Sequence, residues 1–284
     1  MSERIDLTKP HENKNVPIIE LKDAKVVFTT RAGSGLFHRN RITAVNGVNL
    51  KLMPGKTIGI VGESGCGKST TANVMCGLQS LTSGQVLFKG QDITHRTAKE
   101  RMEIGRVVSV VFQDPATALN ARMSVADQLI DPLAVHHLGG KKERDKRAHE
   151  LIRMVGLPFS VLGALPGQLS GGQRQRVAIA RALSLNPDAI IADEPTSALD
   201  VSVRAQILNL LSDLKRRLGL SMVFISHDIQ TIRYISDDVI VMNHGTIVEH
   251  GTADEVMRHP VDDYTRTLMA AAPSLLHPTA EECA

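Results

Sequence analysis

A glycine-rich stretch in the first third of the chain has the residue types needed to bind phosphate. It reads GESGCGKST from Gly62 to Thr70 and fits the pattern G-x-x-x-x-G-K-[ST]. Glycines let backbone N–H groups and the N-terminus of a following helix come close to an anion. We therefore expect Lys68 to neutralise the β and γ phosphates of a nucleotide and the Ser69 hydroxyl to bind Mg²⁺. The expected phosphate-binding residues are Gly62, Glu63, Ser64, Gly65, Cys66, Gly67, Lys68, Ser69 and Thr70.

Two carboxylates follow a short apolar run further along the chain. Residues Ala189 to Ala192 lead directly into Asp193 and Glu194, and ligand sites of α/β proteins form at the carboxyl ends of such strands. Asp193 is expected to hold Mg²⁺ through water, and Glu194 is expected to polarise an attacking water as general base. An acidic pair at a strand end could instead cap the next helix. The phosphate-binding loop upstream favours the catalytic interpretation.

A third stretch, LSGGQRQRVAIARAL from Leu169 to Leu183, begins with glycines and continues as a basic amphipathic pattern. Taken alone, its arginines at 174, 176 and 181 are also compatible with a face that binds nucleic acid. Its order after the phosphate loop and before the acidic pair argues against that. In this order the three stretches resemble the ATP-binding cassette (ABC) ATPases.

The resemblance implies roles for further residues. In that family Ser170, Gly171 and Gly172, followed by Gln173, open a helix that binds the γ-phosphate of ATP held by the opposite subunit. The matching elements SVVFQDP, SALD and FISHD supply Gln113, Asp200 and His227 in the family's order.

By the same resemblance, Gln113 contacts Mg²⁺ and the lytic water and senses the membrane partner. Asp200 organises the dimer interface, and His227 contacts the γ-phosphate. The catalytic set expected is thus Glu194, His227 and Gln113, and the metal set is Ser69, Gln113 and Asp193. Adenine usually stacks on an aromatic residue near the N-terminus in this family. Phe28 is our candidate, and Phe37 is the alternative.

The elements that must position these residues can be expected from the pattern. Short strands are expected near Ile18 to Leu21, Lys25 to Thr29, Ala44 to Leu52 and Gln85 to Lys89, and they suggest a small antiparallel region. Thr57 to Val61 has the continuous apolar character of a buried parallel strand. Residues from about 115 to 185 have a helical pattern. Further strands are expected at Ala189 to Ala192, Met222 to Ser226 and Val239 to Met242, with a helix at Val203 to Leu218.

This alternation predicts an α/β fold with a mostly parallel sheet, an antiparallel N-terminal β subdomain and a helical insert. The resemblance implies the P-loop NTPase (RecA-like) core of the ABC ATPase fold. We expect a flexible leader over residues 1–16 and a nucleotide-binding domain over 17–250. The helical subdomain is expected at about 115–185, and a C-terminal extension at 251–284.

Composition excludes several other classes of protein. The chain has 284 residues, a net charge of +3 and 22% charged residues, so no nucleic-acid partner is expected. No apolar run approaches the roughly 18 to 20 residues needed to span a bilayer, and the N-terminus does not resemble a signal peptide. The three cysteines lack metal-ligand spacing. We expect free thiols and no iron–sulfur cluster.

The resemblance narrows to ATPases of oligopeptide, dipeptide and nickel importers. It rests on VFQDPATALNARMSV from Val111, DEPTSALDVSVRAQIL from Asp193 and HPVDDYTRTLMAAAP from His259. It implies ATP and Mg²⁺ as ligands and a second ABC ATPase subunit, identical or paralogous. It also implies two membrane permease subunits, an indirect substrate-binding protein and a peripheral place on the cytoplasmic face of the membrane.

The segment from Asp114 to Val125 is where the resemblance places a groove for a helix of the permease, and we expect Leu119 and Met123 to contribute to it. An exporter ATPase and a soluble ABC ATPase without a transport role are the alternatives. The single signature motif and the absence of a long coiled-coil pattern before it argue against the second.

Overall fold

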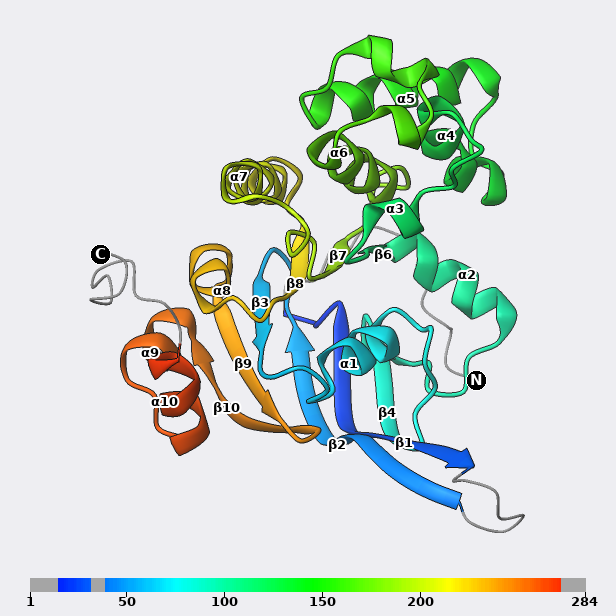
Figure 1. Ribbon diagram of the computed structural model, residues 1–284. Coiled ribbons are helices and arrows are strands. Elements are labelled where there is room, and N and C mark those ends of the chain that lie inside the picture. The colour runs from blue at the N-terminus through cyan, green and yellow to red at the C-terminus, as the bar shows by residue number, and fades with distance from the viewer. Residues whose placement is uncertain (1–14, 32–38, 272–284) are drawn as a thin grey trace, which may run out of the picture.

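Figure 1 shows the chain as a computed structural model, which describes residues 15–31 and 39–271. The alternative adenine candidate Phe37, Cys283 and most of the leader expected at residues 1–16 lie outside these residues. Among the described residues, no helix combines the length and the apolar character needed to cross a bilayer.

The centre of the fold is a six-stranded sheet in the order β10-β9-β3-β8-β7-β6. Neighbouring strands run parallel except at the β9–β10 edge, as the mostly parallel sheet predicted from the sequence requires. Every residue of β3 and β8 is buried, which explains their uninterrupted apolar character. The strands are β3 (Thr57–Val61), β6 (Val108–Val111), β7 (Ala189–Asp193), β8 (Ser221–Ile225), β9 (Asp238–Asn243) and β10 (Thr246–Thr252).

A smaller antiparallel sheet in the order β2-β1-β4-β5 faces this layer. Its strands are β1 (Ile19–Arg31), β2 (Arg39–Leu52), β4 (Ser83–Phe88) and β5 (Gln91–Asp92). The two short strands predicted before residue 30 are one long strand, β1, whose pairing with β2 shifts register between Leu21 and Val27. Asp23 interrupts it with a positive φ of 46°, so the sequence pattern breaks where the backbone bulges.

Helix α1 (Lys68–Met75) lies between the two sheets (Figure 1). One apolar cluster joins the three layers, with Val45 of β2, Met75 of α1 and Ile225 of β8 all fully buried. A second cluster connects the other face of the large sheet to the helices that follow it. The phosphate-binding loop is therefore fixed at both of its ends by core packing.

The helical insert occupies the span for which the sequence predicts helices. It contains α3 (Pro115–Ala118), α4 (Val125–Val135), α5 (Lys141–Met154), two 3₁₀ turns (Phe159–Gly163 and Pro166–Gln168) and α6 (Gly171–Ala182). Helix α5 buries Ala148, Leu151 and Ile152 and turns its charged first half outward. Leu119 is buried in the same cluster, with 3% of its surface exposed. It is therefore a core residue, and the expectation that it lines a surface groove is wrong.

Several helices and strands of the structure were not predicted from the sequence. They are α2 (Ala98–Val107), β5, β6, α8 (Ile229–Ile235), β10, α9 (Ala253–Arg258) and α10 (Asp263–Ala270), while the predicted helix over 203–218 is α7 (Val201–Leu218). The boundary placed at residue 250 falls inside β10. Helices α9 and α10 pack on the large sheet's core through Val256, Tyr264 and Leu268, beside the β9–β10 edge in Figure 1.

Asp237 joins three of these elements. Its carboxylate accepts hydrogen bonds from the Thr57 N–H at the start of β3 and from Lys215 Nζ of α7, both at 2.6 Å. Its own carbonyl accepts the Ala253 N–H that opens α9. Burial opposes the charged form, but the bonds from Lys215 and Thr57 hold the pKa of Asp237 below its ordinary value.

We expect Asp237→Asn to lower the free energy of unfolding at pH 7 by about 1 kcal/mol, a value discounted for the partial exposure of the pair. Because the folded pKa is depressed, this stabilisation is present above the unfolded pKa of about 3.9 and is lost as pH falls through the folded value. Urea titrations of both chains at pH 7 and near pH 3 check it.

Asp213→Asn on the same helix is the control, since Asp213 pairs only with exposed Arg216. It should cost less than about 0.5 kcal/mol at either pH. An Asp237→Asn effect no larger than this control, or one that does not diminish between pH 7 and pH 3, would contradict the role given to Asp237.

Candidate nucleotide site

The phosphate-binding loop connects the carboxyl end of β3 to the first turn of α1. Gly67 immediately precedes α1 with φ of 106°, and a Cβ there would lie 2.2 Å from the Ala44 carbonyl oxygen, so only glycine fits. No side chain of the described residues caps α1, and its first turn carries no acidic residue. Its first N–H groups are therefore available to an anion.

Lys68 is held directly over this loop. Its Nζ donates to the carbonyl oxygens of Gly62 and Glu63, both at 2.7 Å, and only 6% of the residue is exposed. These two bonds hold the ammonium in place at the loop. A long and mobile side chain therefore does not have to be ordered when a ligand binds. The loop is thus arranged for a phosphate before one binds.

A cavity of about 260 Å³ opens above the loop. It is lined by Ser64, Gly65, Gly67, Lys68, Ser69, Thr70, Gln113 and Glu194. Most of the residues predicted to bind phosphate therefore meet at one place, together with two of the three predicted catalytic residues. Gly62, Glu63 and Cys66 do not line it. Cys66 is 5% exposed, and its Sγ lies 3.8 Å from Lys68 Nζ.

Glu194 stands at the carboxyl end of β7 in an unusual backbone conformation. Its φ of 46° lies in the left-handed region, which costs a non-glycine residue about 1 kcal/mol or more. The Glu194 N–H donates to the Ile225 carbonyl at 2.9 Å, and Ser197 donates to the Glu194 carbonyl. This turn directs the carboxylate into the cavity, where a fifth of the side chain is exposed.

Two side chains from neighbouring strands contact the Glu194 carboxylate. Gln113 Nε2, just after β6, lies 3.3 Å from one carboxylate oxygen. His227 Nδ1, just after β8, lies 3.3 Å from the other. His227 is mostly exposed on its outer side, so it can reach a ligand. The structure therefore brings the three predicted catalytic residues together around one carboxylate.

Asp193 and Ser69 form the candidate metal site. The Ser69 hydroxyl lies close enough to the Asp193 carboxylate to favour its charged form. Burial and the neighbouring Glu194 charge raise the pKa of Asp193, while the Ser69 hydroxyl and the charge of Lys68 oppose that rise. A hydroxyl and one carboxylate suit Mg²⁺, which takes its other oxygen ligands from water and substrate phosphates. No group of three acidic, histidine or cysteine side chains that could hold a metal occurs within the described residues.

The signature segment does not line the phosphate cavity of its own chain, although Gly171 and Gln113 share the lining of a smaller cavity of about 80 Å³. Ser170 caps α6, accepting the Gln173 N–H at 3.3 Å while Gln173 accepts the Ser170 N–H at 2.9 Å. A Cβ on Gly172 would lie 2.8 Å from Val203 of α7, so the glycine permits close packing of α6 on α7. Of the described residues that line the phosphate cavity, none comes from 170–173. Ser170 is exposed, which leaves this helix start open to another molecule.

The structure shows the local contacts of Asp200 and Phe28 within the chain. Asp200 caps α7, where its carboxylate accepts the Val203 N–H and the Ser202 hydroxyl, both at 2.9 Å. The Val203 bond, followed by that from Ser202, lowers the pKa of Asp200. Phe28 is 38% exposed on β1 opposite Ile42. The roles of Asp200 at a dimer interface and of Phe28 under adenine stay predictions.

Tyr264 contacts the phosphate-binding loop, and this contact was not predicted from the sequence. Its hydroxyl accepts the Glu63 N–H at 3.0 Å across 201 positions of chain. No local pattern signals such a contact, because it depends on where α10 docks.

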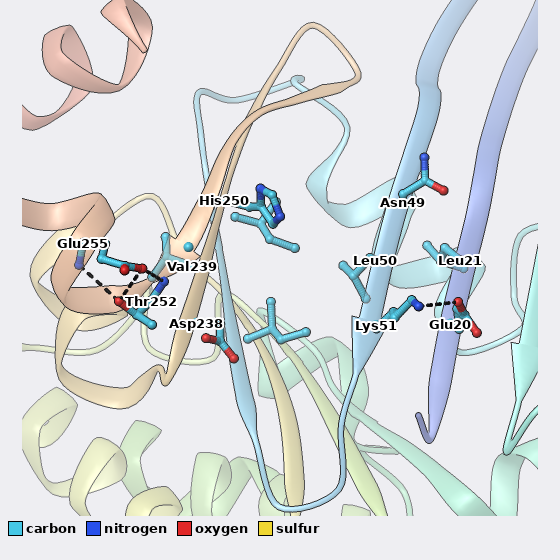
Figure 2. Close-up of a pocket in the computed structure, with 13 residues that line it drawn as sticks. Glu20, Leu21, Asn49, Leu50, Lys51, Asp238, Val239, His250, Thr252 and Glu255 are labelled. Carbon is cyan, nitrogen blue, oxygen red and sulfur yellow. Dashed lines mark hydrogen bonds and ion pairs between the residues drawn. The ribbon is translucent and has the colours of Figure 1, made fainter. Parts of the chain in front are cut away.

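A larger cavity of about 570 Å³ lies near the amino ends of β3 and β9, away from the phosphate loop. Figure 2 shows it between the β1–β2 hairpin and the β9–β10 hairpin, with α9 at one side. Three of its charged side chains, Glu20, Lys51 and Glu255, have partners on the wall. Lys51 pairs with Glu20 at 3.2 Å, and Glu255 accepts the Thr252 hydroxyl at 2.8 Å.

Comparison with known proteins agrees with this arrangement. Residues 45–197 match the family model described as ABC transporter. The chain is 42% identical over 260 residues to the oligopeptide transport ATP-binding protein OppF of Lactococcus lactis subsp. lactis (strain IL1403), covering 91% of this chain and 81% of that protein. It is also 42% identical over 260 residues to the dipeptide transport ATP-binding protein DppF of Escherichia coli (strain K12), covering 91% and 77%.

Among solved structures, the fold is similar to a dimeric post-hydrolysis state of the ATP-binding cassette MJ0796 bound to ADP and Pi. The TM-score is 0.73 at 33% identity, and the match covers 83% of this chain and 98% of that chain. The α/β architecture with its antiparallel β subdomain is thus that of an ABC ATPase cassette.

Glu194→Gln is expected to lower ATP turnover by about 10²- to 10⁴-fold, because the amide cannot take a proton from water. ATP binding should persist, since the loop and Lys68 are unchanged. Steady-state phosphate release and equilibrium binding of ATP measure the two effects. Glu150→Gln, at a partly exposed position on α5, is the control and should match the unchanged chain. Full turnover by Glu194→Gln would remove the assignment of Glu194 as base.

Proposed function

The chain belongs to the ABC transporter family and is an ATP-hydrolysing subunit of a transporter of that family, and we propose that this transporter imports oligopeptides or dipeptides. The observation that carries the ATPase assignment is the Glu194 carboxylate, contacted from two strands by Gln113 and His227 beside the loop of Lys68. The peptide cargo is inferred from the similarity to OppF and DppF, which are ATP-binding proteins of oligopeptide and dipeptide transport.

In the proposed reaction, the N–H groups at the start of α1 and the Lys68 ammonium hold the β and γ phosphates of ATP. Gln113 orients a water molecule, and Glu194 accepts its proton as the water attacks the γ-phosphorus. The bond from the γ-phosphorus to the bridging oxygen breaks, and ADP and phosphate are released. His227, in contact with Glu194 on its other side, donates a hydrogen bond to the γ-phosphate. Mg²⁺, when bound by Ser69, Asp193 and Gln113, neutralises charge on the phosphate oxygens.

The second half of the proposed site comes from another ATPase subunit, identical or paralogous. Its Ser170, Gly171 and Gly172 would meet the γ-phosphate at the exposed N-terminus of α6. Their absence from the lining of the phosphate cavity of their own chain and the exposure of Ser170 support this. Asp200, at the neighbouring start of α7, would lie at the same interface. ATP then closes the dimer, and hydrolysis releases it.

The remaining proposed partners are two membrane permease subunits and, indirectly, a substrate-binding protein outside the membrane. The ATPase would then sit peripherally on the cytoplasmic face of the membrane. The surface after Gln113 is the proposed contact with the permease. Leu119 is excluded from it by burial and Met123 is half-buried. The exposed residues of the segment are Asp114, Thr117, Asn120, Ala121 and Arg122. This surface directly follows the catalytic Gln113 in the chain. A movement of the permease contact could therefore be transmitted to the hydrolytic site over a short segment.

Isolation of the intact membrane complex through this subunit, followed by mass spectrometry, tests the importer assignment. We expect two permease subunits and a second ABC ATPase, and we expect uptake of labelled di- and oligopeptides by cells carrying the complex. An exporter would give efflux of cargo without a binding protein. A soluble ABC ATPase would copurify with no membrane protein. Uptake of nickel in place of peptide would correct the cargo alone.

Arg122→Glu is expected to reduce peptide uptake at least about tenfold, because it reverses a charge at the proposed permease contact. ATP hydrolysis by the isolated subunit should change less than twofold, since Arg122 lies outside the phosphate cavity. Transport and ATPase assays on the same preparations measure both.

Arg217→Glu, at an exposed position near the end of α7, provides the matched control and should leave uptake intact. Normal uptake by Arg122→Glu would remove this surface from the coupling route.

A further inference from the structure

The last described helix reaches back to the phosphate-binding loop. Tyr264, the second residue of α10, accepts a hydrogen bond from the Glu63 N–H at 3.0 Å. Its ring packs in part against the core of the large sheet. Burial, with the nearby Glu63 charge, raises the pKa of Tyr264, so the phenol stays protonated and neutral at physiological pH.

This contact falls on the peptide unit that also holds Lys68. The Gly62 carbonyl and the Glu63 N–H belong to one planar peptide group. Its oxygen accepts Lys68 Nζ at 2.7 Å, and its N–H donates to Tyr264. Rotation of this group would break both bonds together, and each bond polarises the group in the direction that strengthens the other. The tyrosine is therefore linked to the ammonium through a single rigid unit.

The helix carrying Tyr264 is itself firmly fixed. The Glu249 carboxylate of β10 accepts the Val261 N–H at 2.9 Å and the Asp262 N–H at 3.0 Å. The Asp262 carboxylate then accepts the Tyr264 N–H at 2.8 Å. Arg266 donates to the Val261 carbonyl at 2.7 Å. The position of the hydroxyl is thus set by β10 and by the turn before α10, not by the loop that it contacts.

We propose that Tyr264 is a positioning residue for the phosphate-binding loop: its hydroxyl fixes the Gly62–Glu63 peptide so that Lys68 is held for the phosphates. The inference rests on the proposed phosphate site and extends it to the segment after the sheet. Tyr264 does not line the phosphate cavity. Its effect should therefore appear in nucleotide affinity and not in the chemical step.

Tyr264→Phe removes only the hydroxyl and tests this directly. We expect the dissociation constants of ATP and ADP, and KM for ATP, to rise about three- to tenfold, the size of one neutral hydrogen bond. The turnover number should stay within about twofold. A purely structural role would instead lower the melting temperature without nucleotide and leave both dissociation constants unchanged, and that result would overturn the proposal.

Tyr234→Phe is the matched control, because it removes the chain's other tyrosine hydroxyl, which donates to Asn209 at 2.6 Å on α7. It should leave nucleotide affinity unchanged. An equal loss of affinity in Tyr234→Phe would also count against a specific role for Tyr264.

The same control gives a second readout with Tyr264 intact. The chain has two tyrosines and no tryptophan, so in Tyr234→Phe the ultraviolet emission comes from Tyr264 alone. Bound phosphate draws on the Lys68 ammonium and so weakens its bond to the Gly62 carbonyl, which alters the polarisation of the Glu63 N–H that Tyr264 accepts. Addition of ATP or ADP should therefore change that emission with the midpoint of nucleotide binding, whereas adenosine should not. Emission that stays constant while nucleotide binds would overturn the proposal even if Tyr264→Phe failed to fold.

Lys68→Ala separates this inference from the site on which it rests. If Lys68→Ala abolishes nucleotide binding and Tyr264→Phe does not weaken it, the inference alone fails. If Lys68→Ala binds ATP normally, the proposed phosphate site and the inference fail together.

Discussion

The site depends on one constraint, the parallel pairing of β3, β8, β7 and β6. Parallel strands present their carboxyl ends at one edge of a sheet, so the segments that leave them meet there. Lys68 follows β3, Glu194 follows β7, and Gln113 and His227 follow β6 and β8. The two contacts of 3.3 Å to the Glu194 carboxylate exist because its two neighbours in the sheet are these strands.

Local chemistry then refines what the sheet brings together. The left-handed backbone of Glu194 directs its carboxylate into the cavity. Gly67, where a larger residue would clash with the Ala44 carbonyl, allows α1 to begin at the phosphate-binding loop. Lys68 is bound by the carbonyls of its own loop. Glu194 and Gly67 have backbone conformations with positive φ, and all three residues line the cavity. The surrounding core, buried on both faces of the sheet, holds these conformations in place.

The sequence alone predicted the buried parallel strands and the residues after them, because a run such as TIGIV followed by a glycine-rich turn has few other interpretations. It did not predict β6, whose four residues directly follow the charged helix α2, nor β10, whose polar His250 and Glu249 hide an edge strand. Burial of Leu119 and the docking of Tyr264 on the loop depend on contacts between distant segments. Periodicity and spacing carry no information about such contacts.

The central claim is that one chain holds only half of a hydrolytic site. Its phosphate cavity is lined by the loop, Gln113 and Glu194, while its own signature residues do not line that cavity and Ser170 is exposed. The most direct measurement is the ATP hydrolysis rate per chain as a function of chain concentration, with the oligomeric state followed by analytical ultracentrifugation in the same buffer. The account predicts ATP binding but little hydrolysis in the monomer, and a rate per chain that rises as dimers form, either of this chain or with its partner ATPase. A constant, robust rate in a strictly monomeric sample would contradict it.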